Sequence, residues 1–171
     1  MGRKIIVCDV KECMGCRICD YICSAVSEGV INPRKSRIRT IRIHPTFDLA
    51  VSCRKCEEPK CVLVCPHQAI SQDKRTGLIT IDEKKCDCCG WCIEKCPIGA
   101  IILHLEDKTA KVCDFCQEYK KPQCVEYCPK EALKYLDISR VEKDSFQRML
   151  QDLIECKLKL EESALKVGKS G

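Results

Sequence analysis

Residues 84–99 read KKCDCCGWCIEKCPIG and contain five cysteines. Four of them, Cys86, Cys89, Cys92 and Cys96, follow the spacing C-x2-C-x2-C-x3-C and are followed by a proline. This spacing is typical of thiolates that hold [4Fe–4S] clusters. Cys88 breaks the register, and the other four match the pattern without it. The stretch therefore predicts a loop built around iron–sulfur ligation, with one cysteine to spare.

Similar cysteine runs occur four times along the chain. Together they use sixteen of the nineteen cysteines, and all except the first run end in C-x3-C-P. The runs are Cys13/Cys16/Cys19/Cys23, Cys53/Cys56/Cys61/Cys65, Cys86/Cys89/Cys92/Cys96 and Cys113/Cys116/Cys124/Cys128. In two-cluster proteins, the first three thiolates of a run bind one cluster and the fourth binds the other. The proline that follows cannot extend a preceding helix, so it sets the direction in which the chain leaves the site.

Structural zinc is the competing metal. Zinc sites use two C-x2-C pairs, often together with histidine. Here each run has three or more closely spaced cysteines, and the whole chain has only three histidines. The pattern favours iron–sulfur clusters.

Three cysteines lie outside the register: Cys8, Cys88 and Cys156. We interpret them as small hydrophobic residues or inert thiols. Cys88 has an alternative role, because it could replace Cys89 if the loop slipped by one residue.

The composition excludes several classes of protein. Cysteine makes up 19 of 171 residues, whereas Phe, Trp and Tyr together make 5%, so either disulfides or a metal must supply much of the folding free energy. The start, MGRKIIVCDVKEC, has no apolar export signal, and no apolar run is long enough to span a membrane. We therefore expect reduced thiols and a cytoplasmic location rather than a secreted disulfide scaffold. The net charge of +5 comes without an aromatic platform, so we expect no nucleic-acid binding.

A longer repeat follows the cysteine runs. After Cys65, Cys96 and Cys128 the sequence reads PHQAI, PIGAI and PKEAL, which share the pattern C-P-x-x-A-[IL]. Small and apolar residues at fixed offsets indicate a turn on a cluster and then a strand, in a duplicated module. We also predict strands at 4–10, 78–81 and 109–112, each before a cysteine run.

These four runs, with no proline after Cys23 and a wide gap between Cys116 and Cys124, resemble four-cluster ferredoxin-type electron-transfer subunits of anaerobic oxidoreductases. That family includes the beta subunits of dimethyl sulfoxide reductase and formate dehydrogenase. It also includes the small iron–sulfur partners of hydrogenases, carbon monoxide dehydrogenase and tungsten aldehyde oxidoreductases. The resemblance covers residues 4–136.

The resemblance implies which thiols share a cluster, and we number the resulting quartets first to fourth. They are Cys13/Cys16/Cys19/Cys128, Cys23/Cys113/Cys116/Cys124, Cys53/Cys56/Cys61/Cys96 and Cys65/Cys86/Cys89/Cys92. Because every ligand position is cysteine, the resemblance implies four [4Fe–4S] clusters and no three-iron cluster.

The implied fold is α+β, with two tandem bacterial-ferredoxin-like modules followed by a C-terminal amphipathic helix. Residues 1–30 with 105–140 would form one module, residues 31–104 an inserted second module, and residues 141–171 the helix and tail. The implied function is non-catalytic: single electrons pass through the clusters between a partner enzyme's active site and ferredoxin or another redox carrier. A tungsten or molybdenum enzyme acting on aldehydes or formate is the favoured partner. The alternatives are a free-standing polyferredoxin and the iron–sulfur partner of a carbon monoxide dehydrogenase or hydrogenase.

Two further features have alternative interpretations. Residues 34–43, RKSRIRTIRI, predict a half-buried strand with Arg37, Arg39 and Arg42 on its outer face. That face either balances nearby acidic clusters or docks an acidic partner. His67 is either an exposed loop residue or a neighbour that tunes a cluster.

The tail carries an apolar helical stripe: Phe146, Met149, Leu150, Leu153, Ile154 and Leu158. Such a stripe predicts an amphipathic helix, with Asp144 as its N-cap. It would either fold back on the cluster domain or pack on a partner, which could be a second copy of this chain.

Overall fold

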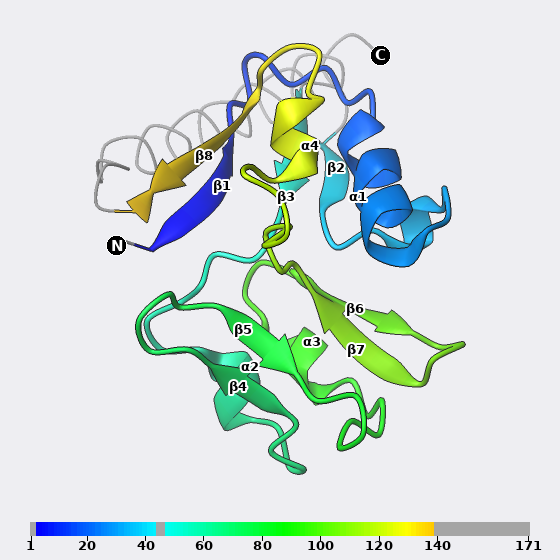
Figure 1. The fold of residues 1–171 in the computed structure, drawn as a ribbon, viewed down its shortest axis with the longest axis vertical. Helices are drawn as coiled ribbons and strands as arrows, with labels where there is room; N and C mark the ends of the chain where they lie inside the picture. Colours follow the sequence, from blue (N-terminus) through cyan, green and yellow to red (C-terminus); the bar gives the residue numbers. More distant parts are fainter. Residues whose placement is uncertain (1–2, 44–46, 139–171) are drawn as a thin grey trace, which may run out of the picture. The chain divides into compact units, whose positions relative to one another are not determined.

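The computed structural model describes residues 3–43 and 47–138, and the predicted tail helix lies outside these ranges. Short strands alternate with short helices (Figure 1). In chain order the elements are β1 (Lys4–Cys8), α1 (Ile18–Glu28), the 3-10 helix η1 (Pro33–Lys35), β2 (Arg39–Ile43), β3 (Phe47–Val51), α2 (Lys60–Leu63), β4 (Ile70–Gln72), β5 (Ile79–Ile81), α3 (Trp91–Lys95), β6 (Ile101–His104), β7 (Thr109–Val112), α4 (Gln123–Glu126) and β8 (Leu133–Asp137). A mixed fold of short strands and helices is confirmed, while its division into two tandem modules stays a prediction.

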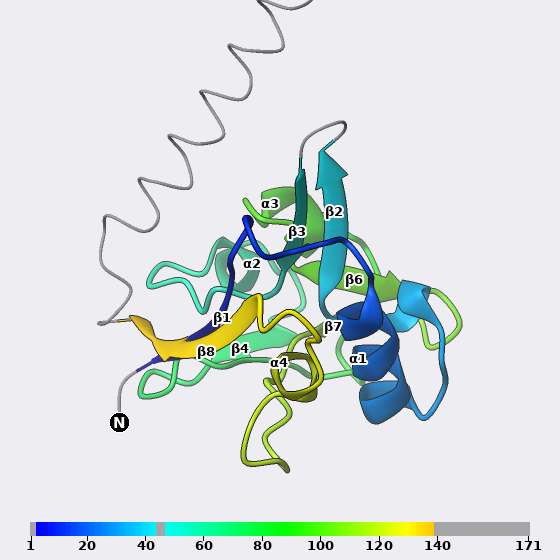
Figure 2. The same ribbon diagram turned by 90° about the horizontal axis from the view of Figure 1, so that it is seen from above.

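The strands form antiparallel two-stranded sheets, and this pairing determines which cysteine runs lie close together. Within the described ranges the sheets are β1–β8, β2–β3, β4–β5 and β6–β7. β1 and β8 join the two ends of the described chain, with Lys4 opposite Asp137 and Cys8 opposite Leu133 (Figures 1 and 2). α1 packs against α4, and α2 packs against α3. The first cysteine run is thereby brought to the fourth, and the second run to the third.

The strands predicted before the cysteine runs are present. The strand at 109–112 has the predicted bounds, and the one predicted at 78–81 forms as Ile79–Ile81. The strand predicted at 4–10 ends earlier, at Cys8, because Asp9 begins a turn. The Asp9 carboxylate accepts a hydrogen bond from the Lys11 backbone N–H at 3.1 Å.

β2 differs from the prediction in the face that it buries. The strand forms, but Ile41 and Ile43 are 41% and 36% exposed. Thr40 turns inward instead, and both its backbone N–H and its hydroxyl donate to Oδ1 of Asp20, at 3.1 and 3.2 Å. The alternation of residues predicted the strand, but the buried partner on α1 determines which face is covered.

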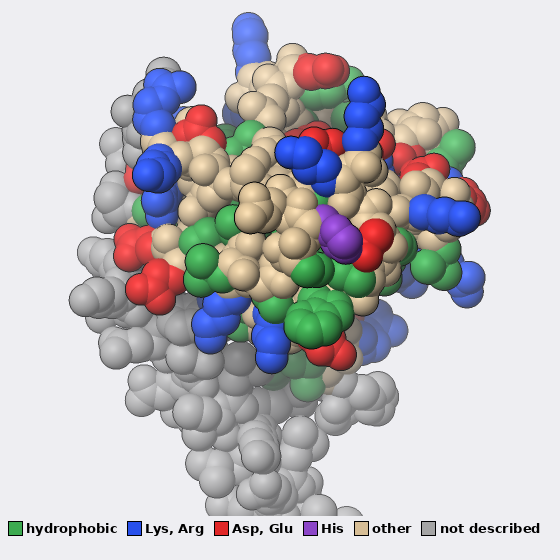
Figure 3. Space-filling model, turned by 90° about the horizontal axis from the view of Figure 1, so that it is seen from below, with side chains coloured by type: hydrophobic (Ala, Val, Ile, Leu, Met, Phe, Trp, Pro, Cys, Tyr) green, Lys and Arg blue, Asp and Glu red, His purple; other side chains and the backbone are tan. Residues whose placement is uncertain are grey.

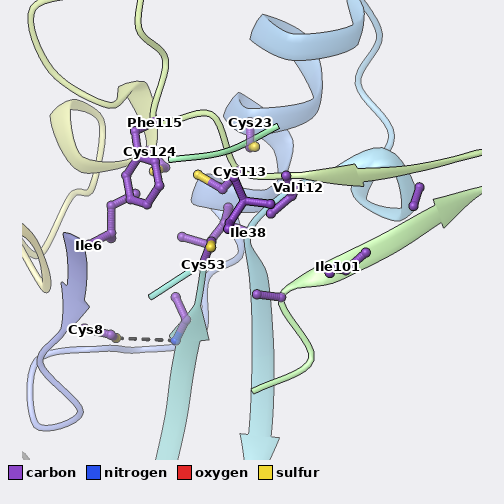
Figure 4. Packing of buried hydrophobic residues seen from close by; sticks show 14 of the residues in the cluster. Ile6, Cys8, Cys23, Ile38, Cys53, Ile101, Val112, Cys113, Phe115 and Cys124 are labelled. Atoms are coloured by element: carbon purple, nitrogen blue, oxygen red, sulfur yellow. Dashed lines mark hydrogen bonds between the residues drawn. The ribbon is translucent and has the colours of Figure 1, made fainter. Parts of the chain in front are cut away.

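Cysteines occupy much of the buried core. Six of the buried apolar positions are Cys8, Cys23, Cys53, Cys92, Cys113 and Cys124. Among the described residues, Phe115 is the one aromatic side chain in this core, at 4% exposure. Figure 4 shows Cys23, Cys53 and Cys113 gathered around the small aliphatic core. Thiols therefore fill space that larger apolar side chains fill in other small domains.

Some apolar side chains remain at the surface. Leu63 on α2 is 79% exposed and Trp91 on α3 is 58% exposed. Figure 3 shows hydrophobic side chains interspersed with charged ones on the face that it views. Both residues lie within two positions of a cysteine, so apolar surface stays exposed beside the second and third cysteine runs.

Candidate metal centre

Each cysteine in the described ranges is a free thiol; Cys156 lies outside those ranges. Free thiols can become the thiolates that iron or zinc requires. The arrangement of their sulfurs decides which of these metals fits.

The first quartet surrounds one hollow. Cys13, Cys16 and Cys19 line it from the loop before α1 and the start of that helix, and Cys128 lines it from the loop after α4. Gly15, with φ +65°, belongs to the same wall, and a Cβ at this position would lie 2.3 Å from the Asp48 carboxylate. Only glycine permits both this left-handed conformation and this close approach.

The second quartet is the most deeply buried. Burial raises the pKa of Cys113 and of Cys124 well above the ordinary value for a thiol. The thiols that add to this effect at Cys124 include the rest of its quartet: Cys113, Cys23 and Cys116. The α1 thiol and the thiols around α4 therefore share one apolar environment.

The third quartet also comes together in space. Burial and, after it, neighbouring thiols raise the pKa of Cys61 to about 11. Those thiols are Cys53, Cys96 and Cys56. Cys96, from the following cysteine run, thus lies with the three leading thiols of the second run.

The fourth quartet joins three thiols of the third cysteine run with Cys65 of the second run. Burial and, after it, the thiols of Cys86 and Cys89 raise the pKa of Cys92 to about 11. The Trp91 backbone N–H lowers the pKa of Cys89, whereas burial and neighbours that include the Cys65 thiol raise it. All four residues are therefore neighbours, although their assignment as ligands stays a prediction.

Neighbouring quartets also approach one another. The Cys19 thiol of the first quartet contributes, after burial, to the raised pKa of Cys124 in the second. The Cys53 thiol of the third quartet likewise contributes to the raised pKa of Cys113 in the second quartet. The Cys61 thiol of the third quartet contributes to the raised pKa of Cys92 in the fourth quartet. The four quartets therefore form a sequence from first to fourth.

The sulfur spacing fits iron–sulfur clusters better than zinc. A tetrahedral zinc site with Zn–S bonds of about 2.3 Å places its sulfurs roughly 3.8 Å apart. Within residues 3–43 and 47–138, no three thiol sulfurs lie within 4.8 Å of one another. Four thiols around a wider space suit a cluster, because each sulfur then binds a different iron.

Backbone N–H groups point at the ligand sulfurs. Five predicted ligands accept such a hydrogen bond at 3.3–3.5 Å: Cys23 from Arg37, Cys53 from Lys55, Cys65 from Ala69, Cys86 from Ala110 and Cys96 from Ala100. Hydrogen bonds to sulfur stabilise the negative charge that accumulates on a reduced cluster, and they are one way in which a protein sets its potential.

The repeated C-P-x-x-A pattern builds three of these turns. The residue before each alanine is left-handed, with φ of +49° at Gln68, +61° at Gly99 and +49° at Glu131. Its N–H donates to the carbonyl oxygen of the cysteine, at 3.2, 3.2 and 3.0 Å respectively. The alanine that follows is buried in each repeat, at 3%, 5% and 2% exposure. The next residue begins β4, β6 or β8, as the pattern predicted.

The arginines of the predicted docking face have partners within the chain. Arg37 pairs with Glu28 at 2.9 Å and with Asp114 at 2.7 Å. Arg39 donates to the Ile101 carbonyl at 2.9 Å, and Arg42 pairs with Asp48 at 2.8 Å. These contacts favour the interpretation in which the basic face balances local acidic groups.

The two described spare cysteines lie beside quartets. Cys8 is buried on β1, where burial raises its pKa to about 12 and the Cys13 thiol is a neighbour. Cys88 has φ +63° and neighbours Cys86. The next residue, Cys89, donates its N–H to Asp87 at 3.2 Å. This bond holds the loop in a register in which Cys89 lies near Cys65.

His67 is a loop residue that is half exposed. Its Nε2 lies 2.8 Å from Oδ2 of Asp87, the residue that also accepts the Cys89 N–H. The ring is therefore paired with a carboxylate, which agrees with the simpler interpretation of an exposed loop histidine. Sequence reasoning did not single out the buried residues Lys55 and His104: Lys55 occupies a variable position of a C-x2-C spacing, and His104 belongs to no recognisable motif.

The described helices are all too short or too polar to cross a membrane.

Known proteins resemble this chain over most of its length. Residues 46–138 match a family model described as a 4Fe-4S dicluster domain. The aliphatic sulfonate oxidoreductase, polyferredoxin-like subunit of Pyrococcus furiosus is 37% identical over 126 residues, or 74% of this chain and 72% of that protein. The putative electron transport protein YsaA of Escherichia coli K12 is 36% identical over 152 residues, or 82% and 94%. The thiosulfate reductase electron transfer subunit PhsB of Salmonella typhi is 30% identical over 162 residues, or 86% and 81%.

Proposed function

This chain belongs to the family of 4Fe-4S dicluster domains, and from that premise we propose that it is an electron-transfer subunit with four [4Fe–4S] clusters. The chain itself is non-catalytic: its residues bind, space and insulate the redox groups. When bound, such clusters supply one-electron redox chemistry. The observation that carries the proposal is the meeting of sixteen thiols as four neighbouring quartets.

The residues around the thiols support this role. Burial of the second quartet excludes water, and exclusion of water is one of the factors that set a cluster's potential. The N–H groups of Arg37, Ala69 and Ala100 can stabilise extra negative charge on the sulfurs that they face. The contacts between quartets support an order of transfer from first to fourth, or the reverse. Each quartet then has a neighbour to which an electron can pass.

We also propose that the chain works with a catalytic oxidoreductase and that the far end of the relay serves ferredoxin or another carrier. Two of the relatives are named as subunits of oxidoreductases. The resemblance of the cysteine runs to those of beta subunits leads us to favour a tungsten or molybdenum enzyme acting on aldehydes or formate. The free thiols support a reducing compartment, and we propose the cytoplasm.

The test measures electron transfer from substrate to the clusters, in addition to the association of the two subunits. The tagged chain would be purified anaerobically from its source with any bound subunit, and an aldehyde or formate would be added. We expect tungsten or molybdenum in the bound subunit and loss of the visible cluster absorption when substrate is added. The matched control is Cys116→Ala, which removes one second-quartet thiol and should interrupt the transfer, whereas Cys88→Ala should not.

Two results would contradict the proposal. Purification of the chain alone, reducible by ferredoxin, would instead support a free-standing polyferredoxin. A bound subunit whose substrate leaves the visible absorption unchanged would exclude electron transfer from that enzyme.

A further inference from the structure

Lys55 is a buried lysine in the loop between two cysteines of the third quartet. The residue is 5% exposed and has φ +50°. Its backbone N–H donates to the sulfur of Cys53 at 3.5 Å. The position is therefore tightly constrained, and a lysine is an unusual residue to place there because burial disfavours its charge.

The ammonium group lies between two quartets. Its Nζ is 3.8 Å from the centroid of the Phe115 ring, a distance typical of a cation–π contact. Phe115 lies two residues after Cys113, whereas Lys55 lies two residues after Cys53 and donates its backbone N–H to that sulfur. Cys113 belongs to the second quartet and Cys53 to the third. Figure 4 shows both of these residues and Phe115 within one cluster of buried side chains.

The surrounding residues give this cation no carboxylate partner. Among the residues that the structure describes, no Asp or Glu forms an ion pair with Lys55. Gly77, with φ +71°, lies against it, and a Cβ there would be 3.2 Å from the Lys55 Cβ. A buried charge without a counter-ion is strongly unfavourable. The sulfurs of Cys53 and Cys113, one from each quartet, are the nearby groups that would carry negative charge with clusters bound.

We propose that Lys55 is a positioning residue that serves as the shared counter-ion of the second and third quartets and favours the reduced state of the groups that they bind. The proposal rests on the proposed function, since it concerns potentials within the relay. Addition of one electron makes each bound group more negative by one charge, and a fixed cation between them lowers the free energy of that form. The effect should reach the second and third quartets and spare the first and fourth.

The test is a potentiometric titration of the fully loaded chain, followed by electron paramagnetic resonance. Lys55→Met removes the charge and keeps the length of the side chain. We expect it to lower two of the four midpoint potentials. At a fixed applied potential, the ratio of reduced to oxidised cluster should fall about tenfold at each of the two sites. For a one-electron couple this corresponds to a midpoint potential lower by about 59 mV. Lys55→Arg should keep the wild-type values. Lys74→Met, which removes an exposed lysine from the β4–β5 turn, should also leave them unchanged.

The shift should persist at high salt, because ions screen buried charges poorly. If Lys55→Met does not retain iron, Lys55→Gln carries the same prediction. If fully loaded Lys55→Met has all four midpoint potentials unchanged, the proposed role of Lys55 is wrong, while the proposed electron-transfer function is unaffected. A shift of the same size in Lys55→Arg would overturn it too, because the charge would not be the cause. A wild-type chain with no reducible iron would instead contradict the proposed function.

Discussion

Backbone N–H groups face the sulfurs of Cys65 and Cys96, both predicted ligands, through local turns that each need only a few residues. Gln68 and Glu131 adopt the left-handed conformation that Gly99 adopts at the equivalent place. A non-glycine residue in this conformation costs about 1–2 kcal/mol. The chain accepts that cost at two of the three turns, where the left-handed N–H donates to the cysteine carbonyl and the alanine that follows is buried. The turn therefore depends on the conformation more than on glycine itself.

The two adjacent cysteines at 88 and 89 should differ in their effect on iron binding. Cys89 neighbours Cys65 of its quartet, and its N–H donates to Asp87, whereas Cys88 neighbours Cys86 and falls outside the cysteine spacing. We expect Cys89→Ser to lose iron, because a hydroxyl replaces a thiolate ligand. Cys88→Ser should keep the wild-type iron content. Iron and protein assays on anaerobically purified variants measure the difference, and the opposite result would mean that the loop binds in the shifted register.

At the scale of elements, Asp20 joins α1 to β2. Its carboxylate is 2% exposed and accepts from both the N–H and the hydroxyl of Thr40. Its second oxygen lies 3.0 Å from Nε of Arg17 at the start of the helix. Arg17 and Thr40 also line the hollow of the first quartet. One buried carboxylate thereby positions both a helix and a strand around a predicted cluster.

Asp20→Ala should weaken the connection between α1 and β2 and, with it, the binding of a cluster by the first quartet. The change removes two hydrogen bonds to the half-buried Thr40, each of which contributes about 0.5–1.5 kcal/mol. We expect a lower denaturant midpoint in anaerobic guanidinium titrations, with visible absorbance and circular dichroism changing together. Asp20→Asn keeps an oxygen acceptor for Thr40 and serves as the matched control. Equal losses in the two variants would show that charge, rather than the hydrogen bonds to Thr40, holds the elements together.

The sequence predicted the local parts of the site well. The cysteine spacing and the C-P-x-x-A repeat indicated the loops, the turns and the strands that begin at Ile70, Ile101 and Leu133. Each of these features depends on residues within about ten positions of one another, so that periodicity and turn chemistry are sufficient.

Two contacts between distant residues were not predicted from the local sequence patterns. The inward face of β2 depends on Asp20, and the burial of Lys55 depends on Phe115 and Gly77. A lysine inside a C-x2-C spacing looks like an ordinary loop residue until the partners that cover it are known. The same limit applies to Arg37, whose contacts with Glu28 and Asp114 favour the interpretation of a face that balances local acidic groups.

At the scale of the whole molecule, thiols from distant parts of the chain must meet. Cys128 joins Cys13 in one hollow, and Cys23 joins Cys124, because β1 pairs with β8 and α1 packs on α4. Metal binding that requires such distant ligands is coupled to folding. With thiols filling so much of the core, the amount of bound cluster reports both the ligand assignment and the integrity of the fold.

The central claim is that sixteen cysteines hold four [4Fe–4S] clusters, and iron and acid-labile sulfide per chain test it most directly. On anaerobically purified protein the account predicts about 16 of each, four for each quartet. About 12 of each, with zinc absent, would mean that one quartet is empty or wrongly assigned. Zinc bound without sulfide would contradict the electron-transfer function altogether.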